Sequence, residues 1–506
     1  MSIARAGLES EVADEPVGAG GSSPTRFRPA DDAADAPADK LAAQVAQRIE
    51  ADIIRNGWPV GDVLGSEQDL QGRYGVSRSV LREAVRLVEH HQVAGMRRGP
   101  GGGLIVSAPD AGPATRALVI YLEFIGLGAE DLMQARLLLE PLAASLAADR
   151  VTEEGIARLR DLLAQEVARD EEPGLDSQDL LHVLIGELSG NPALHLFIDV
   201  LTRLTSRYVS TTRRITKDEL AAGKATSRES HLAITEAVIA GDTGRAAGTT
   251  SQHLVEVGEK LRTLRGKRAP RAGGAGGSTA EVPGAKLAEV IAGRIHDEIA
   301  RRGWPIGHVL GSESDLLARY GVSRAVLREA VRLLEYHAVA RMRRGPGGGL
   351  VVTAPEPDAS IDTMALYLDY RGVTPEDLRA VREAIELGTL GQVMARRDDP
   401  DVSDRLTAAI ARTDEPTAPG RTGADRFHTE LAVLSGNPVL VLFLRILTEL
   451  WSRHTANTAS PTPGPDAAAT VEHIHKRILQ SLLDGDEGVA RHRMRRHLEA
   501  LSAWYD

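Results

Sequence analysis

Apolar residues recur at helical spacing near the beginning of the chain. Leu41, Val45 and Ile49 lie four residues apart, which predicts an amphipathic helix. The motif NGWP at 56–59 is typical of a turn and ends this pattern. Residues 1–37 have no periodic apolar positions and are rich in Ala, Asp, Gly and Pro, so we expect a disordered tail.

Capping residues predict two further helices. Ser66 can cap a helix that reaches Arg73, and Asp69, three residues after Ser66, completes an approximate capping box. After a break at 74–76, Ser77 can cap a second helix. The order of elements is therefore helix, turn, helix.

The helix after Ser77 is predicted to have one apolar and one basic face. Its core face carries Leu81, Val85 and Val88. A slightly spiralling basic stripe consists of Arg78, Arg82 and Arg86. The major groove of DNA admits a helix with such a stripe, whereas many charged helix faces are simply solvated. The stripe alone leaves both interpretations open.

A glycine-rich hairpin is expected next, at 96–106, where the sequence reads MRRGPGGGLIV. Glycine allows close approach to a sugar-phosphate wall, and the two arginines supply positive charge. The segment 76–106 has a net charge of +3 within a chain whose net charge is −11. Helix, turn, helix and basic hairpin together favour DNA binding.

The chain repeats this pattern. Residues 75–106 and 321–352 differ at six of thirty-two positions, and an offset of 246 residues also superposes SGNP at 189–192 on SGNP at 435–438. The stretch 265–285 is rich in glycine and is expected to be a flexible linker. We call residues 38–264 the first module and 286–506 the second module.

Composition narrows the class of protein. A chain of 506 residues is too long for one core. It has no cysteine, which excludes disulfides and thiolate metal sites. The N-terminus lacks an apolar signal-peptide region, and no run of about 18 apolar residues would span a membrane. These features predict a soluble, cytoplasmic protein without membrane contact.

The remainder of each module is predicted to be all-helical and carries three spaced histidines. Turns at 241–242 and 485–486 place the last two histidines of each set on neighbouring helices. Facing helices can aim imidazoles into one interior, and three nitrogens with a carboxylate or water suit Zn, Ni, Fe or Mn. Ordinary polar core histidines are the alternative. The two sets are His182, His231 and His253, and His428, His475 and His497.

Residues 41–106 and 287–352 contain the motifs SRSVLRE and SRAVLRE, respectively. Both segments resemble the winged helix-turn-helix of the GntR family of bacterial transcription regulators. The parts that follow resemble the all-helical FCD effector domain of the FadR-like branch. The resemblance implies a mainly α fold in which winged helix-turn-helix domains, each with a small β wing, alternate with FCD-like bundles. The expected domains are winged helix-turn-helix at 38–108 and 286–354, and bundles at 109–264 and 355–506.

In that family, arginines of this motif contact operator bases and phosphates, and the wing enters the minor groove. The implied DNA-binding residues are Ser77, Arg78, Ser79, Arg82, Arg86, Arg97, Arg98 and Gly99, and Ser323, Arg324, Arg328, Arg332, Arg343, Arg344 and Gly345. One departure concerns the family pattern Pro-Ser/Ala-Glu-Arg, which here reads GSEQ at 65–68 and GSES at 311–314. A usual phosphate-contacting arginine is thus missing from both modules.

The resemblance also implies a divalent metal in each bundle. Many FCD domains add an aspartate four residues before the first histidine. Here Asp179 and Asp425 lie three residues before it, a spacing that still reaches the same helix face. Arg136 and Arg382 can pair with Glu140 and Glu386 within a helix or hold the carboxylate of an effector.

The sequence thus predicts a transcription regulator, either a repressor or an activator, that binds double-stranded DNA and responds to a small organic acid. Because relatives bind as homodimers of a single module, the duplication predicts a covalent pseudo-dimer on a near-palindromic operator. A metal-dependent enzyme fused to DNA-binding units is an alternative, although motifs such as GxSxG and HExxH are absent and no carboxylate is obviously free beside the histidines. An architectural DNA binder with inactive bundles is another.

Overall fold

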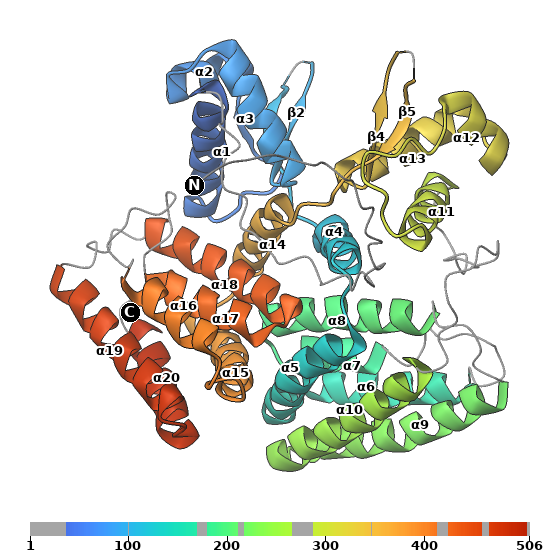
Figure 1. Cartoon of the computed structure of the whole chain (residues 1–506). Helices are drawn as coiled ribbons and strands as arrows, with labels where there is room; N and C mark the ends of the chain where they lie inside the picture. The colour runs from blue at the N-terminus through green and yellow to red at the C-terminus, as the bar shows by residue number, and fades with distance from the viewer. Residues whose placement is uncertain are drawn as a thin grey trace, which may run out of the picture.

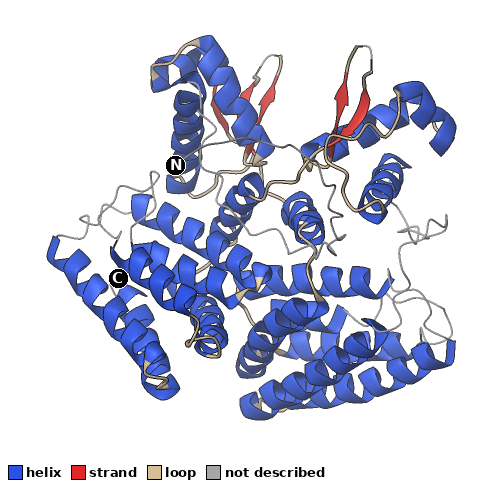
Figure 2. Cartoon of the chain, viewed as in Figure 1, coloured by secondary structure: helices blue, strands red, loops and turns tan. Residues whose placement is uncertain are grey.

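The computed structural model describes residues 37–99, 101–168, 180–210, 217–265, 287–345, 347–411, 424–457 and 465–502. The predicted tail and linker lie outside these residues, except for Pro37, which begins a helix, and Arg265, which ends one. The described part of the chain is mainly helical, and its strands are confined to the two winged regions (Figure 2). No helix among the described residues is long and apolar enough to cross a membrane.

The first module begins with a winged-helix domain and continues with helices. The winged-helix elements are α1 (Pro37–Arg55), β1 (Val63–Gly65), α2 (Glu67–Tyr74), α3 (Arg78–His90), β2 (Ala94–Arg97) and β3 (Gly103–Val106). The first bundle contains α4 (Ala111–Phe124), α5 (Ala129–Arg150), α6 (Glu153–Ala168), α7 (Leu180–Leu188), α8 (Pro192–Ser210), α9 (Lys217–Ile239) and α10 (Thr243–Arg265).

The second module repeats this order. Its winged-helix elements are α11 (Leu287–Arg301), α12 (Glu313–Tyr320), α13 (Arg324–Tyr336), β4 (Ala340–Arg343) and β5 (Gly349–Val352). The second bundle contains α14 (Asp358–Tyr370), α15 (Pro375–Met394), α16 (Pro400–Ala411), α17 (Ala424–Ser435), α18 (Pro438–Asn457), α19 (Pro465–Leu483) and α20 (Glu487–Ser502).

Local signals place the winged-helix elements as predicted. Ser66 caps α2 with a complete capping box, since its backbone N–H donates to Asp69 and its hydroxyl accepts from the Asp69 N–H. Gly75 ends α2 with φ of 66°, a conformation that glycine adopts without steric cost. Ser77 then caps α3, and its hydroxyl accepts the N–H of Val80.

The sheet of the first winged-helix domain contains a strand that the sequence did not predict. The β2–β3 hairpin is confirmed, with Gly95 opposite Ile105, and β1 adds a third antiparallel strand beside β3. At three residues, β1 is too short to give an alternating pattern. In the second module the same place holds only a bridge between Val309 and Val351.

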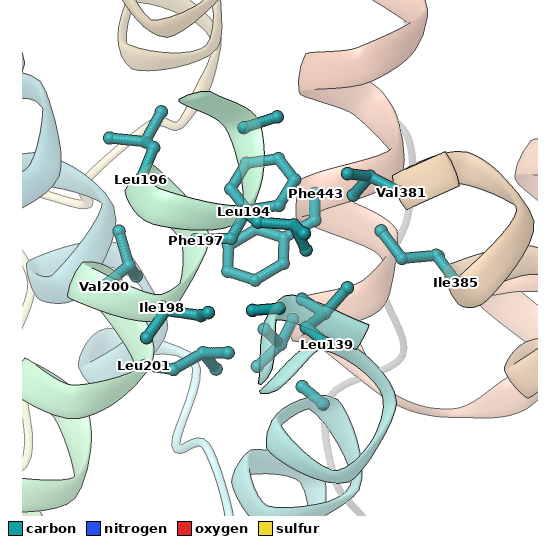
Figure 3. Close-up of a cluster of buried hydrophobic side chains, with 14 of the residues drawn as sticks. Leu139, Leu194, Leu196, Phe197, Ile198, Val200, Leu201, Val381, Ile385 and Phe443 are labelled. Atoms are coloured by element: carbon teal, nitrogen blue, oxygen red, sulfur yellow. The ribbon is translucent and has the colours of Figure 1, made fainter. Parts of the chain in front are cut away.

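The two bundles share one hydrophobic core. Phe197 of α8 and Phe443 of α18 stack with centroids 4.0 Å apart and an interplanar angle of 4° (Figure 3). Leu139 of the first bundle and Val381 and Ile385 of the second point into the same cluster. Burial of these apolar surfaces stabilises the contact between modules as it would a domain core.

The SGNP turns join the bundles reciprocally. Asn191 donates its side-chain amide to the Asp377 carbonyl at 2.9 Å, and Asn437 donates to the Asp131 carbonyl at 2.9 Å. These two contacts are equivalent under the 246-residue offset, so the modules pack with an approximate two-fold relation. Both side chains also accept N–H groups at the start of the next helix, so the turns have a structural role.

Each winged-helix domain lies against the bundle of the other module. In Figure 1 the first winged-helix domain (blue) lies over the orange second bundle, and the second (yellow) lies over the green first bundle. Trp58 stacks edge-on against Tyr370 of α14 at 5.3 Å, and Trp304 stacks against Phe124 of α4 at the same distance. Leu366 of α14 belongs to the core of the first winged-helix domain.

Equivalent arginines reinforce these crossed contacts. Arg453 of α18 donates to Glu50 of α1 at 3.0 Å, and Arg207 of α8 donates to Asp297 of α11 at 3.1 Å. Arg453 and Arg207 correspond under the offset, but their partners do not, because His296 stands where the first module has Glu50. The two crossed contacts are therefore similar in position and different in chemistry.

Candidate nucleic-acid interface and metal centres

The recognition helices α3 and α13 present their basic stripes to solvent. Leu81 and Val88 of α3 are fully buried, and Val85 is 7% exposed, so the predicted apolar face is confirmed. Every residue predicted to bind DNA is exposed, in both modules. The wings and recognition helices of both modules lie on the same side of the molecule, away from the bundles (Figure 1).

A glutamate in each module binds the recognition arginines. Glu67 accepts two hydrogen bonds from Arg78 at 3.1 Å and one from Arg82 at 2.8 Å. In the second module Glu313 accepts from Arg328 at 3.2 Å and pairs with Arg324 at 3.4 Å. These arginines lower the pKa of Glu67. Such exposed pairs are weak, so a phosphate or a base edge can compete for the guanidinium groups.

The wing is fixed to the recognition helix through a carboxylate. Glu89, near the end of α3, accepts the N–H of Met96 at 2.9 Å, and Glu335 accepts the N–H of Met342 at 2.8 Å. The wing arginines extend into solvent beyond this anchor. A hydrogen bond thus joins strand and helix in each module, and arginines predominate among the exposed charged groups of the two elements.

The structure brings each histidine triplet together inside its bundle. The donor atoms of His182, His231 and His253 lie within 4.8 Å of one another, as do those of the second triplet. In the second bundle Nε2 of His497 lies 3.2 Å from Nε2 of His428 and 3.0 Å from Nε2 of His475. All six side chains are buried. The predicted convergence of the imidazoles is confirmed.

Burial keeps several of these imidazoles neutral. Burial, reinforced by the neighbouring His182 and His231, lowers the pKa of His253 from 6.5 to about 2. Burial and His428 likewise lower the pKa of His497 to about 3. Neutral imidazoles with converging lone pairs are suitable ligands for a divalent cation. The donor set of three nitrogens fits Zn, Ni, Fe or Mn, with a fourth position left for water or a carboxylate.

Glutamates bind the outward nitrogens of some histidines. Nδ1 of His182 lies 2.7 Å from Glu140, Nδ1 of His428 contacts Glu386, and Nδ1 of His231 lies 2.9 Å from Glu166. Each of these glutamates is occupied by an imidazole, and Glu140 and Glu386 also pair with an arginine, so the expectation that no free carboxylate lies beside the histidines is not contradicted. Glu166 could not be recognised from the sequence, because it is 65 residues away from His231.

The predicted aspartate ligands are not placed by the structure. Asp179 lies outside the described residues, and of Asp425 only the backbone, in α17, is described. A metal centre in either bundle therefore stands on its three imidazoles, and the aspartates stay a prediction.

Arg136 and Arg382 form the predicted ion pairs and are buried. Arg136 donates to Glu140, and Arg382 donates to Glu386, both at 2.5 Å. Burial raises the pKa of Glu140, but Arg136 and His182 outweigh it and lower the pKa to about 2. Each arginine thus connects through a glutamate to the first histidine of its triplet.

The surroundings of these arginines differ between the bundles. Arg136 also donates to Thr205 at 3.0 Å, whereas the corresponding position in the second module is Trp451, whose ring centroid lies 5.8 Å from the guanidinium carbon of Arg382. The cavity beside Arg382 and Trp451 has a volume of only about 10 Å³. That space holds about one water molecule.

Comparison with protein families finds the same two domains twice. The profile of the family described as bacterial regulatory proteins, gntR family, matches residues 41–103 and 287–350. The FCD domain profile matches residues 131–256 and 377–500. A winged helix with an exposed arginine stripe, joined to a helical effector bundle, defines a class of DNA-binding transcription regulators.

Similar proteins are regulators as well. The Exu regulon transcriptional regulator of Escherichia coli K12 is 33% identical over 162 residues, and the match covers 32% of this chain and 59% of that protein. The putative HTH-type transcriptional regulator RmpR of Mycobacterium gastri is 32% identical over 202 residues, with 38% of this chain and 71% of RmpR covered. A solved structure, Streptococcus agalactiae GntR, matches at 23% identity with a TM-score of 0.33, covering 43% of this chain and 99% of that one.

The chain belongs to the GntR family of bacterial transcription regulators, and it carries the winged helix-turn-helix and the FCD effector domain of that family in tandem. The matching families and relatives are transcription regulators rather than enzymes.

Proposed function

We propose that one chain binds one near-palindromic operator with both of its winged-helix domains. The observation that carries the proposal is the shared core of the bundles, which holds two exposed recognition helices on one side of the molecule. Joining the modules makes their pairing intramolecular, so it does not depend on protein concentration. A single chain then does what two copies of a single-module regulator would do.

The two half-sites of this operator are not expected to be identical. Ser79 at the start of α3 corresponds to Ala325, and Gly95 in the first wing corresponds to Arg341. A hydroxyl and a guanidinium can bind base edges or phosphates that a methyl group and a glycine cannot. An imperfect palindrome is therefore the preferred site.

Native mass spectrometry of the protein–DNA complex tests this proposal. DNA fragments recovered from the genome with the bound protein would first be trimmed to the minimal protected site. We expect one chain per minimal operator and a binding curve without cooperativity in protein concentration. Two chains per operator with a steep curve would contradict the proposal, because the modules would then pair between chains.

We further propose that the bundles sense a small organic acid and thereby change the affinity of the same chain for DNA, whether the output is repression or activation. The support is chemical: each bundle buries a histidine triplet suited to a divalent metal and an arginine that here pairs with a glutamate and whose fork fits a carboxylate. Elemental analysis after incubation with Zn²⁺ should find bound metal, and chelation should lower the thermal unfolding midpoint, because ligand that binds only the native state stabilises it. A protein that retains no metal after this incubation would contradict the metal part.

A further inference from the structure

The two histidine triplets differ in the hydrogen-bond partner of the histidine that comes second along the sequence, His231 or His475. In the first bundle Nδ1 of His231 donates to Glu166, at 2.9 Å from Oε1 and 3.2 Å from Oε2. In the second bundle Nδ1 of His475 is buried and has no hydrogen-bond partner among the described residues. In an ungapped alignment the position of Glu166 corresponds to Arg412, a residue type that cannot accept an N–H and that lies outside the described residues.

This difference bears on how well each triplet can hold a cation. A carboxylate that accepts the outward N–H fixes the tautomer of an imidazole, orients its ring, and raises the basicity of the other nitrogen. Glu140 and Glu166 do this for two of the three histidines in the first bundle. In the second bundle Glu386 does it for His428 alone among the described residues.

The charge near the metal position differs as well. Glu166 is 7% exposed, so its negative charge acts through a medium of low dielectric and attracts a divalent cation in the first bundle. Among the described residues, Phe427, which stands where the first bundle has Leu181, stacks on the imidazole of His475 with centroids 4.4 Å apart and an interplanar angle of 21°. An aromatic ring positions the imidazole but contributes no comparable charge.

We propose that the two metal centres are unequal and that Glu166 makes the first bundle the high-affinity one. This inference rests on the proposed metal binding by both triplets. Loss of an outer partner of a metal-bound histidine typically lowers metal affinity about 10–100-fold, which sets the expected gap between the two sites. At limiting metal, only the first bundle is then loaded.

A Zn²⁺ titration of the metal-free full-length chain tests the inference. Native mass spectrometry counts bound ions, and competition with a chelator gives the two dissociation constants. We expect two steps separated about 10–100-fold. His231→Ala should remove the tight step, and the matched variant His475→Ala should remove only the weak one. Two equal constants would overturn the inequality while leaving the metal proposal intact, whereas no binding would overturn both.

Variants of Glu166 separate a positioning role from a merely structural one. Glu166→Ala should weaken Zn²⁺ binding in the tight step about 10–100-fold. Glu166→Gln still accepts the N–H but has no charge, so its dissociation constant for this step should lie between those of the unmodified protein and Glu166→Ala. Glu236→Ala on α9 is the control, because this exposed glutamate pairs with Arg245 and its loss should leave both steps unchanged. Thermal unfolding of each metal-free variant checks the fold. An unchanged tight step in Glu166→Ala would contradict the inference.

Discussion

The recognition arginines extend into solvent from helices whose opposite faces are buried. Side chains of Arg78 and Arg82 are 63% and 60% exposed, although both bind Glu67. Glu67 is on α2, next to the DNA-facing surface, so these ion pairs hold the guanidinium groups close to that surface. Because the pairs are exposed, breaking them costs little free energy. A base edge that accepts two hydrogen bonds would bind them more strongly.

We expect Arg82→Ala and Arg328→Ala each to weaken specific operator binding by about 1–3 kcal/mol per lost bidentate contact. Binding measured by fluorescence anisotropy at fixed salt provides the test. Arg203→Ala is a matched control, because Arg203 is an exposed arginine that pairs with Asp199 on α8, within the bundle. If both recognition variants bind the operator as tightly as the unmodified protein, the assignment of α3 and α13 is wrong.

The wing depends on a close approach between β3 and the segment before α2. Gly103 has φ of 150°, and a Cβ placed on it would lie 2.5 Å from the carbonyl oxygen of Gly65 and 2.7 Å from a methyl group of Val63. Gly349 meets Gly311 and Val309 in the same way. Glycine is thus required here for backbone contact and for conformation together.

Gly103→Ala should therefore destabilise the first winged-helix domain by about 1–3 kcal/mol, the usual cost of a strained backbone position. Gly95→Ala is the control in the same hairpin, since a Cβ on Gly95 meets no atom within 4 Å and the second module has an arginine there. Hydrogen exchange of the amides in β1 and β3 would measure the effect. Equal protection in the two variants would contradict this account of the wing.

At the scale of the whole molecule, polar contacts and helix α8 connect the first histidine triplet to the second winged-helix domain. His182 contacts Glu140, which binds Arg136, and Arg136 donates to Thr205 of α8 at 3.0 Å. Two residues further along α8, Arg207 binds Asp297 of α11 at 3.1 Å. In the second bundle Trp451 replaces Thr205, so the corresponding hydrogen bond cannot form.

One equivalent of Zn²⁺ should therefore increase hydrogen-exchange protection of 287–352 more than that of 41–106. The reason is that the proposed tight site lies in the first bundle, against which the second winged-helix domain packs. Thr205→Val keeps the shape of the side chain but removes the hydroxyl, and it should reduce this transfer without changing the amount of Zn²⁺ bound. Equal protection of both winged-helix domains would show that the crossed contacts do not transmit metal binding.

The sequence by itself determined the elements whose signals are local. The capping box at Ser66, the N-cap at Ser77 and the hairpin at 96–106 each depend on residues a few positions apart, and the structure contains all three. The duplication and the family motif determined the class of protein and located the histidine triplets. Periodicity could not detect β1, because three residues are too few to establish an alternation.

Only the tertiary structure decided how the modules combine. Because the two bundles are similar in sequence, each winged-helix domain could pack against the bundle of its own module or against that of the other module. The sequence pattern is compatible with both arrangements. The choice depends on contacts such as Trp58 with Tyr370, and on Arg453 with Glu50, which are 403 positions apart. The same holds for Glu166 and His231, since a buried carboxylate finds its partner through the packing of helices and not through spacing along the chain.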